Sequence, residues 1–371
     1  ETESNFEGEG ISFDENSILY GKLRPYLCKV FLPDRKGICV SEFLVLIPVM
    51  DIADKKFLFY YFLSYIFTDI INGSTFGSKM PRADWRIVGN YKLYLPSLYE
   101  QKYIATFLDQ ETDRINGIID KQTQMIDLLK EKRSALITKA VTKWLDPNAK
   151  MKTSVVDWIG EIPEGWKVTN LKRVLEQKIT DGPHETPELI PDGIPFISAE
   201  SIKNNQIDFD LRRGNISQQL HYEYCKKAKP KLHDIFFIKS GATTGNIAYV
   251  DTTDEFSIWS PLALIRCDEN NLFYKYLFYL MLSNEFKTQV ELAWSYGTQQ
   301  NIGMGVIGRL LIILPKLPEQ MTIAAFLDSE TAKIDTMISK IEKQIELLNE
   351  YKQSLITHAV TGKIDVRGEA A

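Results

Sequence analysis

The chain has 371 residues, of which 44% are hydrophobic and 11% aromatic, so it can bury ordinary cores, and its length predicts two globular units. Its formal net charge of −5 excludes a protein that coats nucleic acid through a general cationic excess, because non-specific affinity depends on phosphates neutralised by Lys and Arg. Any basic surface must be local. The most apolar stretch, Phe57 to Ile71, contains polar residues and predicts a core helix, so no membrane association is expected.

Cysteine usage and the first residues predict an intracellular setting. The four cysteines form no CxxC pair, and no histidine is spaced to complete a zinc site, which favours reduced and mostly buried thiols. The acidic, polar start from Glu1 to Ser4 lacks the basic and apolar regions of a signal peptide. We therefore expect a cytoplasmic protein without a metal centre.

In chain order, the first predicted elements are short β-rich runs broken by Gly, Pro and Asn, among them a strand from Ser17 to Tyr20. An aromatic helical stretch from Phe57 to Phe67 follows. The next segment, Gly77 to Arg82, predicts a polar loop. A proline then precedes the first of two long helical patterns.

The second half of the chain repeats this order, with a strand from Ile235 to Ile238, a helical stretch from Phe273 to Phe286 and a polar loop from Gly297 to Asn301. The two domains are therefore expected to be diverged copies. About seventy residues, Met151 to roughly Gln218, precede the shared strand here and have no counterpart before Glu1. We expect the first domain to lack its N-terminal part, as in a fragment.

The long helical patterns are two copies of one element. Leu95 to Asp146 align without a gap onto Leu314 to Asp365, at a constant offset of 219 residues, and 26 of the 52 pairs are identical. The shared frame runs Leu-Pro-x-Leu-x-Glu-Gln, then Ile-Ala-x-Phe-Leu-Asp-x-Glu-Thr, and closes with Leu-Ile-Thr-x-Ala-Val-Thr. A duplicated element of this length indicates an internal repeat in the whole chain.

Apolar residues three and four apart in each copy predict a helix of some forty residues, roughly 60 Å at about 1.5 Å per residue. These positions are Ile104, Leu108, Ile115, Ile118, Met125, Leu129 and Leu136 in the first copy and Ile323, Leu327, Ile334, Met337, Ile341, Leu348 and Leu355 in the second. Each helix could pack only on its own domain, but duplication favours an antiparallel coiled coil about a pseudo-twofold axis.

The predicted fold class is accordingly α/β, with mixed α+β globular domains joined by two long helices. The expected division is a first domain at residues 1–95, a long helix at 96–145, a second domain at 146–313, a second long helix at 314–365 and a tail at 366–371.

Catalytic motifs are hard to find. The run from Gly241 to Gly245 lacks the lysine of a phosphate-binding loop, no dinucleotide fingerprint follows a strand, and the four histidines are scattered. Asp34, Asp54 and Lys56 superficially resemble the carboxylates and lysine of a metal-dependent nuclease, but Asp54 opens a helix instead of lying on a strand. We expect no catalysis by this chain.

Local polar chemistry is better suited to DNA. Between Pro195 and Asn246 there are eight Lys or Arg against five Asp or Glu, and basic residues follow the shared strand in both domains. Such side chains contact phosphates, whereas Gln and Asn amides can read adenine edges; solvated surface and simple turns remain alternatives. The candidate DNA-binding residues are Lys22, Arg24, Lys79, Arg82, His184, Thr186, Lys203, Arg212, Arg213, Lys226, Lys227, Lys229, Lys239, Ser240, Thr243, Thr244, Gln299, Gln300 and Asn301.

Both repeat copies and the run from Trp158 to Trp166, which reads WIGEIPEGW, resemble the specificity subunit of type I restriction-modification systems. The likeness covers essentially the whole chain. The second copy, from Leu314-Pro315 through Ser354 to Asp365, is similar to that family's second shared helical region. The chain departs from the family at its front, where the first domain should open with a Trp-x-Gly-x-Ile-Pro-type segment.

The resemblance implies a non-catalytic subunit with two target recognition domains, each reading one half of a split double-stranded DNA sequence, and helices that set the spacer. It implies two modification subunits that methylate adenine with S-adenosylmethionine, and restriction subunits that use ATP and Mg²⁺. No cofactor is expected in this chain. A coiled-coil scaffold whose domains bind protein and do not read DNA is the main alternative, and a stand-alone nuclease is a third.

Overall fold

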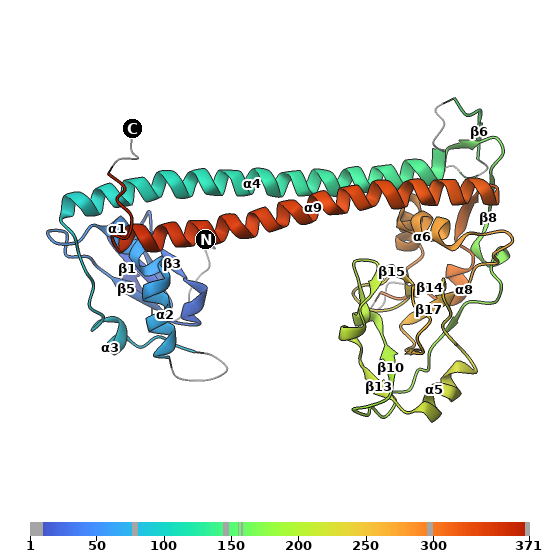
Figure 1. The fold of residues 1–371 in the computed structure, drawn as a ribbon. Coiled ribbons are helices and arrows are strands. Elements are labelled where there is room, and N and C mark those ends of the chain that lie inside the picture. The colour runs from blue at the N-terminus through green and yellow to red at the C-terminus, as the bar shows by residue number, and fades with distance from the viewer. Residues whose placement is uncertain are drawn as a thin grey trace. The chain divides into compact units, whose positions relative to one another are not determined.

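The computed structural model describes residues 10–75, 81–143, 148–154, 156, 159–294 and 300–367 (Figure 1). The chain divides into two compact units, one formed by the residues up to Ile126 together with those from Ile338 onward, and the other by Asp127–Met337. Both units combine helices with small β-sheets. The predicted mixed α/β fold class is therefore confirmed.

In the first unit, strand β2 lies at the centre of a three-stranded antiparallel sheet. Leu19 on β2 is opposite Phe31 on one neighbour and Val45 on the other. The elements are β1 (Ile11–Phe13), β2 (Ile18–Gly21), the 3-10 turn η1 (Pro25–Leu27), β3 (Val30–Phe31), β4 (Gly37–Cys39), β5 (Phe43–Leu46), α1 (Lys55–Leu63), α2 (Tyr65–Gly73), α3 (Trp85–Val88) and the adjoining parts of α4 (Leu98–Lys143) and α9 (Leu317–Val360). The core packs α1 and α2 between this sheet and the two long helices.

The second unit has a four-stranded antiparallel sheet in the order β15-β14-β17-β9, and β8 pairs separately with β18. Its elements are β6 (Met151–Thr153), β7 (Glu161–Pro163), β8 (Lys167–Asn170), η2 (Leu171–Arg173), β9 (Thr180–Asp181), β10 (Ile194–Ile197), η3 (Ala199–Ser201), β11 (Ile202–Lys203), β12 (Gln206–Ile207), η4 (Phe209–Leu211), β13 (Gly214–Ile216), α5 (Gln218–Cys225), β14 (Ile235–Ile238), β15 (Ile247–Tyr249), β16 (Ser257–Ile258), β17 (Leu262–Ile265), α6 (Tyr274–Leu282), α7 (Asn284–Leu292), α8 (Met304–Ile307) and β18 (Leu311–Leu314). The predicted strand Ile235–Ile238 is confirmed, and the two faces of this sheet carry separate cores.

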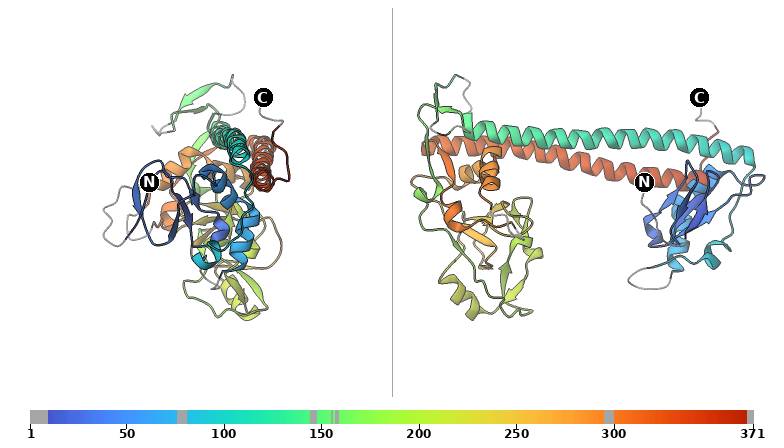
Figure 2. Two further views of the ribbon diagram at one scale, coloured as in Figure 1. Left: turned by 90° about the vertical axis from the view of Figure 1, so that its left-hand side faces the viewer. Right: turned by 180° about the vertical axis from the view of Figure 1, so that it is seen from behind.

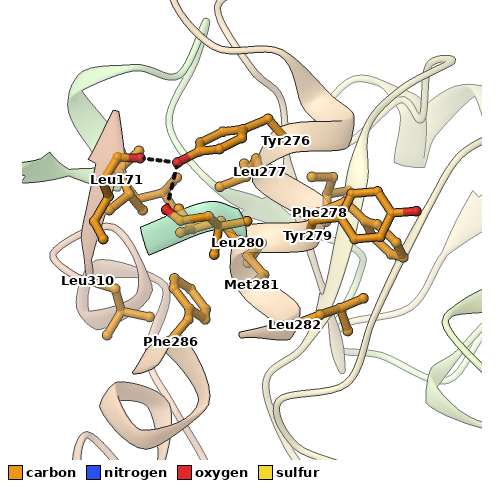
Figure 3. Packing of buried hydrophobic residues seen from close by; sticks show 14 of the residues in the cluster. Leu171, Tyr276, Leu277, Phe278, Tyr279, Leu280, Met281, Leu282, Phe286 and Leu310 are labelled. Carbon is orange, nitrogen blue, oxygen red and sulfur yellow. Dashed lines mark hydrogen bonds between the residues drawn. The ribbon is translucent and has the colours of Figure 1, made fainter. Parts of the chain in front are cut away.

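The core on the helix side of the second unit is built around α6 (Figure 3). Tyr276 is completely buried, and its hydroxyl lies 2.9 Å from the carbonyl oxygen of Ile313 and 3.3 Å from that of Val141. Because a buried hydroxyl needs a partner, this side chain links α6 to both α4 and β18.

The aromatic helical stretches predicted as single helices are each two helices. Ser64 separates α1 from α2 because its backbone is extended (φ −67°, ψ 149°), and its hydroxyl accepts a hydrogen bond from the backbone N–H of Phe67. Ser283 separates α6 from α7 in the same way, with Phe286 as the donor. A serine that satisfies the first N–H groups of a new helix explains the break.

The repeat extends further back than the long helices. In the second unit, the hydroxyl of Tyr279 lies 2.8 Å from Asp328 and 3.2 Å from Thr331, and Lys275 pairs with the same carboxylate at 2.5 Å. The first unit repeats this arrangement at the same offset of 219 residues, with the equivalent residues Tyr60, Asp109, Thr112 and Lys56. The side of each domain that contacts a long helix is therefore built alike.

The Glu-Gln of the repeat frame also has a structural explanation. Gln320 is fully buried, donates to the carbonyls of Asn271 and Pro315 at 2.9 Å each, and accepts from the N–H of Phe273 at 2.8 Å. Gln101 makes the equivalent contacts in the first unit. This glutamine fixes the start of each long helix to the loop before the aromatic helix.

Helices α4 and α9 contain 46 and 44 residues and lie side by side (Figure 2). Arg133 and Asp335 pair at 2.9 Å in the second unit, and Asn116 and Lys352 at 2.9 Å in the first. One residue number falls as the other rises, so the helices are antiparallel, as predicted. Since each compact unit contains part of both helices, the division at helix ends remains a prediction.

Candidate nucleic-acid interface

A buried carboxylate organises the basic residues of the second unit. Asp181 ends strand β9 with only 1% of its surface exposed. Its oxygens lie 2.5 Å from Nζ of Lys227, 3.2 Å from Nζ of Lys239 and 3.1 Å from Nε2 of His184. We call these four residues the Asp181 cluster. Three candidate DNA-binding residues, from three separate parts of the sequence, thus converge on one carboxylate.

The cluster carries more positive than negative charge. Burial would raise the pKa of Asp181, but hydrogen bonds from Lys227 and Lys239 and their charges lower it below its ordinary value. The carboxylate is therefore ionised at neutral pH and faces two ammonium groups. The side chain of Lys239 is 13% exposed, whereas those of Lys227 and His184 are 51% and 69% exposed. Lys227 and His184 are thus the members that an anionic ligand can reach.

The loop after Asp181 is held closely against the sheet. A Cβ atom on Gly182 would lie 1.9 Å from the carbonyl oxygen of Ile258, so only glycine fits. The indole N–H of Trp259 donates to the carbonyl of Glu185 at 3.1 Å. His184 and Thr186, both predicted contacts, are exposed on this fixed loop.

A stacked arginine flanks the same loop. The guanidinium of Arg213 lies 3.9 Å from the ring centroid of Trp259 and pairs with Glu200 at 3.5 Å. Stacking on an indole restricts the guanidinium while leaving its N–H groups available. Arg213 is therefore positioned beside the Asp181 cluster through Trp259.

The polar loops singled out in the second domain meet each other. The N–H of Gly241 donates to the carbonyl of Gln300 at 3.2 Å, and the hydroxyl of Thr244 lies 3.3 Å from the same oxygen. Ser240 and Asn301 form an isolated β-bridge. Ser240, Thr243 and Thr244 therefore share one surface with the exposed amide residues Gln300 and Asn301, while Gln299 lies outside the described residues.

The first unit repeats this junction of two loops. The N–H of Arg24 donates to the carbonyl of Pro81 at 2.8 Å, and Leu23 bridges to Arg82. Arg24 has a left-handed backbone with φ 51°, and Gly241 at the matching turn has φ 104°. A left-handed arginine is uncommon and marks a turn held by its surroundings. Lys22 and Arg24 lie at this junction, Arg82 pairs with Glu42, and Lys79 lies outside the described residues.

Four further candidates contact other groups than Asp181. Arg212 donates to the side chain of Asn215 and to the carbonyl of Phe209, Lys226 pairs with Glu223 at 2.7 Å, and Lys229 lies 4.0 Å from Glu255. Lys203 lies exposed in the β11–β12 hairpin. The predicted basic run is therefore divided among several local environments.

Sequence reasoning missed Asp181, Gly182 and Trp259. The loop from Asp181 to Pro187 attracted notice only for its turn-forming residues. The available signal was a carboxylate directly before glycine, but its burial depends on the pairing of Thr180 with Leu264. Such long-range strand pairing is not visible in local composition.

The nuclease hypothesis is wrong. Asp54 caps α1 by accepting from the N–H of Phe57 at 2.9 Å, and Lys56 pairs with Asp109. Asp34 pairs with Arg35. Throughout the part of the chain that the structure describes, no three His, Cys, Asp or Glu residues are grouped to hold a metal ion, and no helix is long and apolar enough to cross a membrane.

Comparison with known families settles the class of protein. The type I restriction modification DNA specificity domain matches residues 5–127 and 163–347. The chain belongs to this family. Members are the non-catalytic specificity subunits that recognise the DNA sequence for type I restriction enzymes, so the scaffold alternative is not favoured. The two matched ranges also contain both copies of the repeat.

Similar proteins agree with this assignment. The MjaVIII specificity subunit of Methanocaldococcus jannaschii is 28% identical over 91% of this chain and 77% of its own length. The EcoBI specificity subunit of Escherichia coli is 23% identical over 86% and 68%.

Solved structures share the fold. A chain from a structure on assembly and conformational transition of the type I restriction-modification system has a TM-score of 0.75 at 18% identity, covering 97% of this chain and 85% of that one. The HsdS subunit of Thermoanaerobacter tengcongensis has a TM-score of 0.51 at 20% identity, with coverage of 95% and 82%.

Proposed function

We propose that the second unit reads one half of a two-part DNA target through the Asp181 cluster and the loops that meet at Gln300. The observation that carries this proposal is the convergence of basic and amide residues from four separate segments on one side of the β9-β17-β14 sheet. Lys227 and His184 would contact phosphates, and Lys239 would hold Asp181 in place. Gln300 and Asn301 would reach base edges.

The matching turn of Lys22 and Arg24 would serve the first unit in the same way, so that each domain reads one half-site. The antiparallel helices, related by a pseudo-twofold axis, would set the spacer between the half-sites. Two modification subunits would then methylate adenine with S-adenosylmethionine, and restriction subunits would use ATP and Mg²⁺ to cleave. We place this complex in the cytoplasm.

Neighbouring lysines provide a test of phosphate contact. Lys227 reaches the Asp181 cluster, whereas Lys226 pairs with Glu223. In the complex with the modification subunits, Lys227→Ala should weaken binding to all DNA sequences alike and reduce the slope of log affinity against log salt by about 1. Lys226→Ala is the matched control and should leave the slope unchanged. Equal slopes for both variants would contradict the assignment.

Base reading is tested by the methylated sequence itself. Gln300→Ala should relax one base position of the motif, at a cost of roughly 1–3 kcal/mol for the preferred base. The measurement is methylation-site sequencing of DNA from cells that contain the chain and its modification subunit. Lys226→Ala should leave the motif intact, and an unaltered motif with Gln300→Ala would remove this residue from the reading surface.

A further inference from the structure

The two units differ in one respect that the repeat itself reveals. In the second unit, β8 pairs with β18 along four residues, from Leu311 opposite Asn170 to Leu314 opposite Lys167. The equivalent of β18 in the first unit is residues 92–95, at the offset of 219 residues. Among the described residues this segment has no strand partner.

Side-chain exposure follows the missing strand. Ile313 on β18 is 3% exposed, whereas Tyr94, its equivalent, is 79% exposed. The next turn repeats the contrast, since Ile323 is fully buried and its equivalent Ile104 is only partly so. The chain direction and neighbouring helices are the same in both units, so the difference lies in what covers this edge.

A pocket of about 340 Å³ lies beside the uncovered segment, between the start of α4 and the end of α9 within the first unit. Its apolar and aromatic lining includes Tyr94, Tyr99, Tyr103, Ile104 and Val360. The equivalents of Tyr94, Ile104 and Val360 are Ile313, Ile323 and Val141, all of which belong to the core of the second unit.

The second unit shows what fills the equivalent position. Trp166, directly before β8, is 1% exposed and belongs to the same core as Ile313 and Ile323. The occupant is thus a large aromatic side chain followed by an extended segment. A second edge shows the same pattern, because β17 pairs with β9 whereas β5, its equivalent, has only β2 as a strand partner among the described residues.

We propose that this edge of the first unit is a binding site for a β-strand donated by another polypeptide, with an aromatic residue entering the pocket at Tyr94 and the strand pairing with residues 92–95. The donated segment is of the same kind as Trp166–Asn170. Strand addition of this type gains its affinity from backbone hydrogen bonds and its specificity from side-chain pockets. A second copy of this chain is not the favoured donor, because its own segment is engaged with β18.

The proposal is tested with the full chain and a synthetic peptide of residues 161–171, carrying a fluorescent label and titrated by anisotropy. We expect saturable binding of one peptide per chain. Because hot-spot aromatics dominate such contacts, the peptide variant Trp166→Ala should bind about tenfold more weakly or worse. The chain variant Tyr94→Arg should weaken binding similarly, and the exposed position of Tyr94 means that the fold tolerates this change.

The chain variant Tyr222→Arg is the matched control, since Tyr222 is 66% exposed and lies in the second unit; it should bind the peptide as the unaltered chain does. Binding that Tyr94→Arg leaves intact, or no saturation at millimolar peptide, would overturn the proposal. Sedimentation of the chain alone identifies the other occupant: a dimer that Tyr94→Arg converts to monomer would mean that a second copy covers the edge, which also overturns it. None of these outcomes depends on DNA reading.

Discussion

Replacing Asp181 by asparagine should destabilise the chain by about 2–3 kcal/mol, because the change keeps the shape of the side chain and removes its charge. Removing one partner of a buried ion pair typically costs roughly 3–5 kcal/mol. Lys239, at 13% exposure, feels most of that cost, but Lys227 and His184 are exposed enough to regain solvation, which lowers the figure.

Urea unfolding of the full chain measures this loss, with Glu223→Gln as the control. Glu223 and its partner Lys226 are 51% and 57% exposed, so breaking that pair should cost less than about 1 kcal/mol. A loss for Asp181→Asn that is no larger than the loss for the control would refute the view that Asp181 organises its surroundings.

The pH dependence provides a second check of the same group. Because the pKa of Asp181 in the folded chain lies below its ordinary value of 3.8, its contribution to stability is fully present above that value. It is lost as the pH falls through the folded pKa. The difference in stability between the unaltered chain and Asp181→Asn should therefore stay constant between about pH 7 and 5 and shrink below about pH 4. A difference that persists in acid would contradict the ionic explanation.

Three further changes test the packing of the second unit by urea unfolding. Gln320→Ala should cost about 2–4 kcal/mol, since it leaves three buried backbone groups without a partner, and a loss under about 1 kcal/mol would contradict this role. Tyr279→Phe should cost about 1 kcal/mol by removing the hydroxyl that reaches Asp328; no change would mean that the bond is not formed in solution. Gly182→Ala should cost about 1–3 kcal/mol because its Cβ would collide with the carbonyl of Ile258, and an unaltered stability would show that the loop can move away.

The long helices were predictable because the hydrophobic repeat and the duplicated frame constrain each other. A heptad pattern requires a partner helix, and a second copy with the same pattern provides one. The break at Ser64 was missed because the surrounding aromatic residues are apolar on both sides of it, and only the extended backbone and the serine cap reveal two helices. Local propensity alone does not distinguish a capped break from a continuous helix.

The candidate site was only partly predictable. The matched turns at Lys22 and Lys239 were found because both follow the shared strand directly. Asp181 was missed since its role depends on three residues that are distant in sequence, and Lys226 resembled Lys227 in every sequence property although their side chains contact different acids. Which member of a basic run faces which carboxylate is decided by tertiary packing.

The positions of agreement and difference between the two units suggest how the repeat divides its tasks. Contacts that join each domain to a long helix recur at one offset, as in the pairs Tyr60–Asp109 and Tyr279–Asp328. The Asp181 cluster has a counterpart only in Lys22, at the turn that follows the shared strand. A rigid attachment must keep its geometry for both domains to hold their targets at one spacing, whereas a reading surface can change without disturbing that attachment. The repeat therefore places unchanging contacts on the helix side and variable chemistry on the strand side, so that substitutions such as Gln300→Ala alter which sequence is recognised without altering the distance between half-sites.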